Sequence, residues 1–232
     1  MSERPTAADQ VLDAARRPEA GRRLPTALCQ ALCEALPVDA AAIVLLTDTP
    51  YRQLLGVSDR RAVCLEEAEY LAGEGPCVTA AVTGQPVLVD DMARQLPKWP
   101  MFQTCLEQGD YRAVYAFPLR FEADVFGVVA LLCERPGPIT PQTMRDATQA
   151  VAATAQVLLP SFWRLLAHGT LPPWEPRDLL ETHWATTHAA SDRLAGRLGL
   201  PVEEALARLR ARAFAGGQPL SSVAAQVLDP DS

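Results

Sequence analysis

The chain has 232 residues, of which 49% are hydrophobic, and a formal net charge of −7. This length and composition predict a globular protein with two domains, and the acidic balance excludes nucleic-acid binding by the whole surface, so that any such site must be a local patch. No apolar run approaches the roughly 20 residues that span a bilayer, and the N-terminus lacks an apolar signal core. We therefore expect a cytoplasmic protein without a membrane partner.

The six cysteines and three histidines do not form a recognisable metal site. No two cysteines form a CxxC pair, and all three histidines follow the last cysteine in the chain. The sequence also has no Ser-His-Asp, Cys-His, paired-carboxylate or phosphate-loop arrangement. We expect no metal, no identifiable cofactor and no catalytic residue, and hence no enzymatic activity.

Apolar periodicity and turn signals predict a mixed α/β order over the first 160 residues. The expected elements, in chain order, are a helix over 24–36, strands over 40–46 and 52–57, helices over 60–71 and 77–82, a strand over 86–89, a hairpin over 111–120 and 124–133, and a long helix over 140–159. The proline-rich segment 169–176 then interrupts the chain and predicts a semi-rigid joint.

Three short helices are expected after this joint. The first runs from about Leu179 to Leu198, and Gly199 and Pro201 supply a helix stop followed by a helix start. Apolar residues then recur with helical spacing from Val202, and again from Leu220 after a Gly-Gly break.

The first domain resembles a GAF domain over about residues 18–160. The resemblance lies in Gly73-Glu74-Gly75-Pro76-Cys77, the "GQPVLVDD" strand, the "FPLR…FGVVALL" hairpin and "RPGPIT" before the long helix. It implies an α+β fold with a central antiparallel sheet flanked by helices, assigned to residues 1–160, and an unidentified small-molecule ligand.

The last domain resembles the ANTAR domain, an all-α three-helix bundle that binds RNA hairpins and prevents transcription termination. The similarity lies in "LGLPVEEALARLRARAFAGGQPLSSVAAQVL", and the domain is assigned to residues 177–232, after a linker over 161–176. The first helix departs from the family pattern, because Asp192 stands where the family usually has glycine. The resemblance implies structured RNA hairpins as the partner, and nothing specifically implies DNA.

The candidate ligand pocket combines aromatic walls with a few polar groups, as most ligand pockets do. Cys77 at the first turn of a helix suggests a lowered thiol pKa, although a buried packing role is the common alternative. Asp90 and Asp91 are further polar candidates, and ordinary core packing with a solvated acidic loop is the alternative to a pocket. The pocket residues are Glu74, Cys77, Trp99, Phe102, Tyr115 and Phe117.

The candidate RNA site consists of two pairs of arginines with i, i+4 spacing. The two arginines of each pair repel each other mildly, so such pairs suggest a surface that binds a negatively charged partner. Two ring side chains on the first helix of the bundle are candidates for stacking on loop bases. The common alternative for charged residues on helices is a solvated face, and Trp184 could equally pack within its own bundle. The RNA-binding residues are Arg193, Arg197, Arg208, Arg212, Trp184 and His188.

These patterns together predict a regulator in which a GAF sensor controls an ANTAR domain that binds structured RNA and promotes antitermination. The first alternative is a degenerate bundle that acts as a protein-interaction module, and a weaker one is a GAF enzyme that uses Cys77 for sulfoxide chemistry. A homodimer is also expected, because the long helix must bury an apolar stripe against its own sheet or a partner. The stripe consists of Met144, Ala147, Val151, Ala155 and Leu158.

Overall fold

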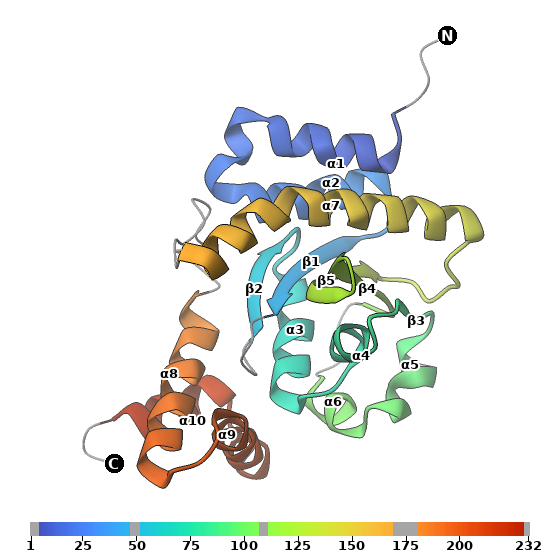
Figure 1. Cartoon of the computed structure of the whole chain (residues 1–232). Helices are drawn as coiled ribbons and strands as arrows, with labels where there is room; N and C mark the ends of the chain where they lie inside the picture. The colour runs from blue at the N-terminus through green and yellow to red at the C-terminus, as the bar shows by residue number, and fades with distance from the viewer. Residues whose placement is uncertain (1–4, 47–51, 107–110, 169–180, 230–232) are drawn as a thin grey trace.

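The computed structural model describes residues 5–46, 52–106, 111–168 and 181–229, and it places a mixed α/β domain before a helical bundle (Figure 1). The first domain contains α1 (Ala7–Arg16), η1 (Pro18–Arg23), α2 (Leu24–Ala35), β1 (Ala40–Leu46), β2 (Arg52–Val57), α3 (Arg61–Ala72), α4 (Pro76–Thr83), β3 (Val87–Val89), α5 (Met92–Gln95), η2 (Leu96–Lys98), α6 (Pro100–Cys105), β4 (Ala113–Phe121), β5 (Asp124–Cys133) and α7 (Pro141–His168).

One antiparallel sheet of five strands forms the centre of this domain. The strand order is β2-β1-β5-β4-β3, and each neighbouring pair runs antiparallel. In Figure 1, α1, α2 and α7 lie on one side of the sheet and α3 to α6 lie on the other. The predicted α+β fold with a central antiparallel sheet is confirmed.

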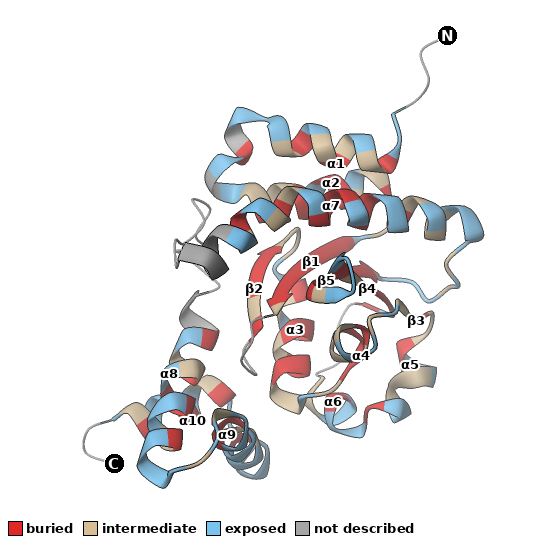
Figure 2. Cartoon of the chain, in the orientation of Figure 1, coloured by how far each residue is buried: buried red, intermediate tan, exposed pale blue. Residues whose placement is uncertain are grey.

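Alternation along the strands gives the two faces of the sheet different side chains. On β1, the small residues Ala40 and Ala42 face the α3 to α6 side, whereas Ile43 and Leu45 face α1, α2 and α7. The same division holds on β4, where Ala116 faces one side and Phe117 the other. Figure 2 shows this buried sheet between the two helical layers.

The apolar stripe of α7 is covered within the chain. Its residues pack in the cluster that α1, α2 and the large-residue face of the sheet form. Helix α1 lies along α7 (Figure 1), and it was not among the predicted elements although Thr6 and Asp9 make a capping box at its start. Because this packing buries the stripe within one chain, the stripe does not require a second copy to cover it.

Helix α7 runs past its expected end at Leu159 to His168, with Pro160 inside it. Its later turns keep an apolar contact, since the ring of Phe162 lies 5.2 Å from that of Phe126. This packing offsets the hydrogen bond that a proline removes from a helix. The predicted linker over 161–176 is therefore helical to residue 168, and its remaining residues, including the Pro-Pro joint, lie outside the described residues.

The C-terminal part of the chain forms three helices, α8 (Glu181–Leu198), α9 (Val202–Gly216) and α10 (Leu220–Leu228). Gly199 and Gly217 end the first two in the left-handed conformation, with φ of 65° and 55°. The three expected helices are confirmed. Within the described residues, none of the helices combines the length and apolar character that a membrane crossing requires.

We predict that Gly56→Ala destabilises the first domain by about 1–3 kcal/mol, because a methyl group on β2 would overpack the contact with α2. A Cβ atom at Gly56 would lie 2.6 Å from the Pro25 carbonyl carbon and 2.7 Å from the Thr26 nitrogen. Gly137→Ala is the matched control, since a Cβ atom there meets nothing within 4 Å. Urea unfolding measures both variants, and equal midpoints would show that this contact does not limit packing.

Candidate functional site

Three charged side chains from α3 and β2 form a buried cluster. Glu66 and Glu69 have no solvent-exposed surface, and Arg52 on the neighbouring strand β2 is 8% exposed. Arg52 Nη1 lies 4.0 Å from Glu69 Oε2, while Arg52 Nη2 and Glu66 Oε2 have no hydrogen-bond partner among the described residues. Two buried carboxylates therefore face one buried guanidinium.

Glu69 caps the N-terminus of α4 from the preceding helix. Its carboxylate accepts hydrogen bonds from the backbone N–H groups of Cys77 and Val78, each at 3.1 Å. The N-cap position itself is Gly75, whose φ is 148° and whose missing Cβ would lie 2.5 Å from the Glu69 carboxyl carbon. Glycine at this position lets the carboxylate reach the helix end, where the helix dipole favours a negative charge.

Burial dominates the protonation of this cluster. It raises the pKa of Glu66 to about 8, with the adjacent Glu69 carboxylate as the second cause and Arg52 opposing both. Burial also raises the pKa of Glu69, against Arg52 and the two N–H donors. The pair is therefore expected to hold a proton near neutral pH.

Cys77 is fully buried beside these carboxylates, and its thiol lies 3.6 Å from Glu66 Oε1. Burial, followed by the charges of Glu66 and Glu69, raises the pKa of this thiol well above its ordinary value. The expectation of a lowered thiol pKa at the helix N-terminus is therefore wrong, because desolvation and two carboxylates outweigh the dipole.

Two of the predicted pocket aromatics fill the apolar space that we expected them to line. Phe102 is fully buried and Trp99 is 8% exposed, and both pack in the cluster between the sheet and α3 to α6. The indole N–H of Trp99 donates to Thr79 Oγ1 at 2.9 Å. Glu74 is also structural, since its carboxylate accepts hydrogen bonds from the Met101 and Phe102 N–H groups at the start of α6.

Tyr115 and Phe117 do not belong to this group. Both lie in the cluster on the opposite face of the sheet, against α1, α2 and α7. The prediction that all four rings line one cup is wrong for these two, because odd-numbered residues of β4 point away from α3 to α6. The Asp90 carboxylate accepts a hydrogen bond from the Gln95 side chain, and the Asp91 carboxylate accepts one from the Ala93 N–H. Both residues therefore stabilise α5 locally.

The two domains meet at Tyr70 near the end of α3. The Trp184 ring of α8 stacks on the Tyr70 ring with 4.5 Å between centroids and 19° between planes. The Arg210 guanidinium of α9 lies 5.0 Å from the centroid of the same Tyr70 ring. Tyr70 is 2% exposed and Trp184 is 6% exposed, so this contact is a buried part of the core.

This contact separates the predicted RNA-binding residues into two groups. Trp184 and His188 face α3, and the His188 ring lies 6.0 Å from that of Tyr70. Burial lowers the pKa of His188 to about 4, which keeps the imidazole neutral at neutral pH. Trp184 is therefore occupied by its contact with Tyr70 and does not share a face with Arg193, which lies about two and a half turns away and projects from the other side of α8.

The four predicted arginines are exposed on the bundle. Arg193 Nη1 donates to the Leu228 carbonyl at 2.9 Å, and Arg212 Nη2 donates to Gln226 Oε1 at 2.8 Å. Arg193 of α8 and Arg212 of α9 thus both reach the last turn of α10. Arg208 forms an i, i+4 ion pair with Glu204 at 2.7 Å.

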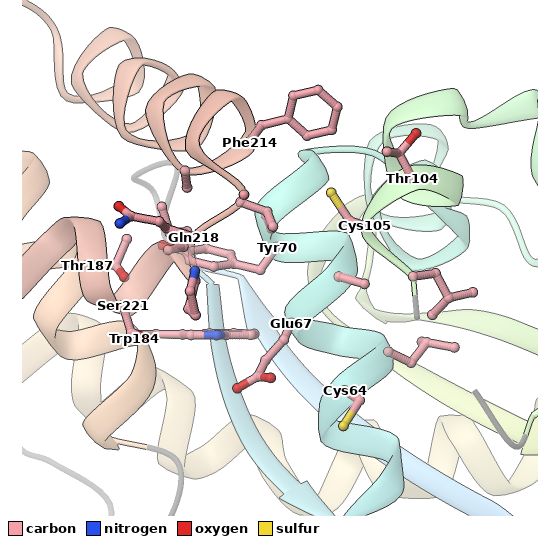
Figure 3. A pocket seen from close by; sticks show the side chains of 18 of the residues that line it. Cys64, Glu67, Tyr70, Thr104, Cys105, Trp184, Thr187, Phe214, Gln218 and Ser221 are labelled. Atoms are coloured by element: carbon pink, nitrogen blue, oxygen red, sulfur yellow. The ribbon is translucent and has the colours of Figure 1, made fainter. Parts of the chain in front are cut away.

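A cleft of about 930 Å³ lies between the two domains. Its walls come from α3, the end of α6 and Tyr111 on one side, and from α8, the end of α9 and the start of α10 on the other (Figure 3). Of the predicted site residues, only Trp184 lines it. Within the described residues, no group of three or more His, Cys, Asp or Glu side chains is placed to hold a metal ion.

We predict that ionisation of Glu66 lowers the stability of the protein as pH rises from 4.5 to about 8, whereas His188, with its folded pKa of about 4, acts in the opposite direction below about pH 6.5. Folded Glu66 keeps its proton over this interval whereas an unfolded glutamate loses it near 4.5, so ionisation favours the unfolded state. Glu66→Gln removes the contribution of Glu66, on the order of 1.4 kcal/mol for each pH unit. Urea unfolding at pH 5, 7 and 9 tests this against the exposed control Glu122→Gln, and equal pH dependence in both variants would place the proton elsewhere.

The comparisons with known proteins identify the first domain. The family model of the GAF domain (GAF_2) matches residues 23–159, and the bundle lies beyond the matched residues. No curated protein matches the chain.

Solved structures of several proteins share the fold of the first domain at low sequence identity. The GAF domain of an Acinetobacter phosphoenolpyruvate-protein phosphotransferase has a TM-score of 0.53 and 12% identity, with 71% of this chain and 95% of that chain covered. The free methionine-R-sulfoxide reductase of Neisseria meningitidis has a TM-score of 0.51 and 15% identity, with 70% of this chain and 96% of that chain covered. A domain described as part of a two-component sensor histidine kinase of Sinorhizobium meliloti has a TM-score of 0.50 and 15% identity, with 64% of this chain and 96% of that chain covered. Such identities show the fold alone. The family match establishes that the chain belongs to the GAF domain family.

Proposed function

We propose that the chain is a regulator in which the GAF domain controls an ANTAR-like bundle, and that this bundle binds structured RNA to promote transcription antitermination. The proposal combines the GAF assignment with the resemblance of residues 177–232 to the ANTAR domain. It places the protein in the cytoplasm, where nascent RNA is made in bacteria.

The single observation that carries the proposal is the convergence of arginines from two helices on a third. Arg193 and Arg212 both contact the last turn of α10, at Leu228 and Gln226. Guanidinium groups at such a junction present several N–H donors toward one region of the surface, which suits the oxygens of an RNA backbone. Both side chains are exposed in the docked arrangement and therefore remain accessible.

The present partners of these arginines do not prevent phosphate binding. Arg208 pairs with Glu204, and both side chains are about half exposed. Exposed pairs of this kind contribute roughly 0.2–1 kcal/mol, so a phosphate can replace the carboxylate at small cost. Arg197, also exposed, lies one turn from Arg193 on α8.

The acidic residue Asp192, next to the arginines of the bundle, favours a second function. Asp192 is exposed and adjacent to Arg193, and the chain carries a net charge of −7, so phosphates meet repulsion as well as attraction. In this alternative the bundle is a protein-interaction module that has lost RNA binding. We propose no enzymatic role in either case, because a buried Cys77 with a raised pKa is a poor nucleophile.

We predict that Arg208→Ala with Arg212→Ala weakens hairpin binding for all RNA sequences tested. Each lost phosphate contact should flatten the dependence of log affinity on log salt by about one unit. Filter binding of a hairpin RNA at two salt concentrations measures both effects. The matched control is Arg16→Ala with Arg145→Ala, two exposed arginines of the GAF domain, which changes the net charge equally. Equal losses in both double variants would indicate a general charge effect without a local site.

We predict that Asp192→Gly strengthens hairpin binding, because it removes a carboxylate that repels phosphate, although glycine destabilises the helix by about 1 kcal/mol. Asp192→Asn separates the two effects, since it removes the charge and keeps the side chain. Both variants should bind more tightly than wild type at low salt. If wild type and both variants bind no hairpin, the protein-interaction module is the better account.

A further inference from the structure

The space that the ligand of a GAF domain was expected to occupy is filled by side chains of this chain. Between the sheet and α3 to α6, Phe102, Met92 and Trp99 are each at most 8% exposed and pack against the small residues of the sheet. Below α3, the buried Arg52, Glu66 and Glu69 complete the filling. A cleft opens instead on the outer side of α3, between the two domains.

We propose that this interdomain cleft is a binding site for a small, uncharged and mainly apolar molecule. The volume of about 930 Å³ lies within the range of roughly 300–1,000 Å³ that ligand sites occupy, and such sites are frequent at domain interfaces. The inference deepens the proposed function in one respect, because it places the sensed molecule where it touches the bundle directly.

The walls of the cleft are mainly apolar, and they come from both domains. Figure 3 shows Tyr70 and Cys105 on the GAF side, and Trp184 and Phe214 on the bundle side. Phe214 remains 41% exposed at the cleft, so a molecule that covers its ring removes apolar surface from water. The apolar lining residues include Leu65, Ala68, Leu71, Leu106, Phe214 and Leu220.

The charges at the cleft favour an uncharged molecule. Arg61 already forms ion pairs with Asp59 at 2.6 Å and Glu134 at 3.0 Å, and its guanidinium lies 5.4 Å from the Tyr111 ring centroid. Glu67 also has a partner in the folded chain. A charged ligand would lose hydration without meeting an uncompensated opposite charge, which is unfavourable. The lining also includes the neutral polar side chains of Thr104, Gln218 and Ser221, which suit one or two hydrogen bonds.

Binding in this cleft depends on docking of the bundle. The Trp184 ring is both a wall residue and the ring that stacks on Tyr70, so separation of the domains removes half of the site. A molecule with affinity for the docked arrangement alone stabilises that arrangement by its differential affinity. Occupancy of the cleft would thus change how firmly α8 and α9 are held against α3.

The test uses Nile red, a neutral and planar apolar dye that fluoresces in apolar surroundings, with the full-length chain. Wild type should bind it saturably at one site. Thr104→Trp fills the cleft from an exposed position of α6 and should weaken binding about tenfold, which corresponds to about 1.4 kcal/mol. Gln103→Trp, an exposed neighbour that does not line the cleft, should leave the affinity unchanged.

Two further variants keep the test decisive if Thr104→Trp does not fold. Phe214→Ala should weaken dye binding about fivefold by loss of apolar contact, whereas Leu198→Ala, equally exposed but outside the cleft, should not. Trp184→Ala should also weaken binding, because it removes a wall from the bundle side. Absence of saturable binding by wild type would overturn the proposal, as would equal affinities in the cleft variants and their controls.

Hairpin binding, measured on the same preparations without dye, separates this inference from the proposed function. Saturable dye binding that follows the cleft variants supports the site even if no hairpin binds, and only the RNA function then fails. Hairpin binding without saturable dye binding overturns the cleft site and leaves the RNA function intact.

Discussion

The contact of Tyr70 with Trp184 and Arg210 fixes the arrangement of the two domains. A ring that is 2% exposed lies between an indole at 4.5 Å and a guanidinium at 5.0 Å, and each partner comes from a different helix of the bundle. Stacking and cation–π contacts of this kind contribute roughly 0.5–2 kcal/mol each when they are shielded from water. Burial lowers the pKa of Arg210 to about 10, which leaves it charged at neutral pH.

Three properties of the molecule follow from this contact. It directs one side of α8 inward, so Trp184 is a core residue while Arg193 and Arg197 remain outside. It creates the cleft, because α3 forms one wall and the docked bundle forms the other. It also connects the bundle to the buried acidic pair, because Tyr70 follows Glu69 directly on α3. A change in the protonation of Glu69, or in the packing around it, therefore occurs one residue away from the docking contact at Tyr70.

Local sequence signals predicted most elements of the GAF domain. β1 was predicted at its observed residues because Asp39 introduces a continuous apolar run, and β5 because a polar turn precedes Asp124. Prediction failed where the answer depended on packing between elements. Nothing local in β4 indicates which helices cover each of its faces, so Tyr115 and Phe117 were assigned to the wrong side. The lowered pKa expected for Cys77 failed for the same reason, since Glu66 and Glu69 belong to another helix.

The bundle shows the same limit more sharply. Arg208, Arg210 and Arg212 alternate along α9, and helical periodicity alone places Arg210 on a different side from the other two. Helical periodicity does not identify the residue that Arg210 contacts, because Tyr70 lies about 140 residues earlier in the chain. The helical spacing between Trp184 and Arg193 was, in contrast, readable from the sequence and would have separated the two groups of RNA candidates.

The most direct test of this account is a nuclear Overhauser measurement between the rings of Tyr70 and Trp184 in the full-length protein, with Trp184→Phe used to assign the indole signals. Centroids 4.5 Å apart predict strong cross-peaks between Tyr70 ring protons and the Trp184 indole. Substitution of Tyr70 by Leu should shift the indole signals toward those of a solvent-exposed tryptophan. Absence of these cross-peaks, with indole shifts that Tyr70→Leu does not change, would contradict the docked arrangement on which the cleft and the outward arginine surface depend.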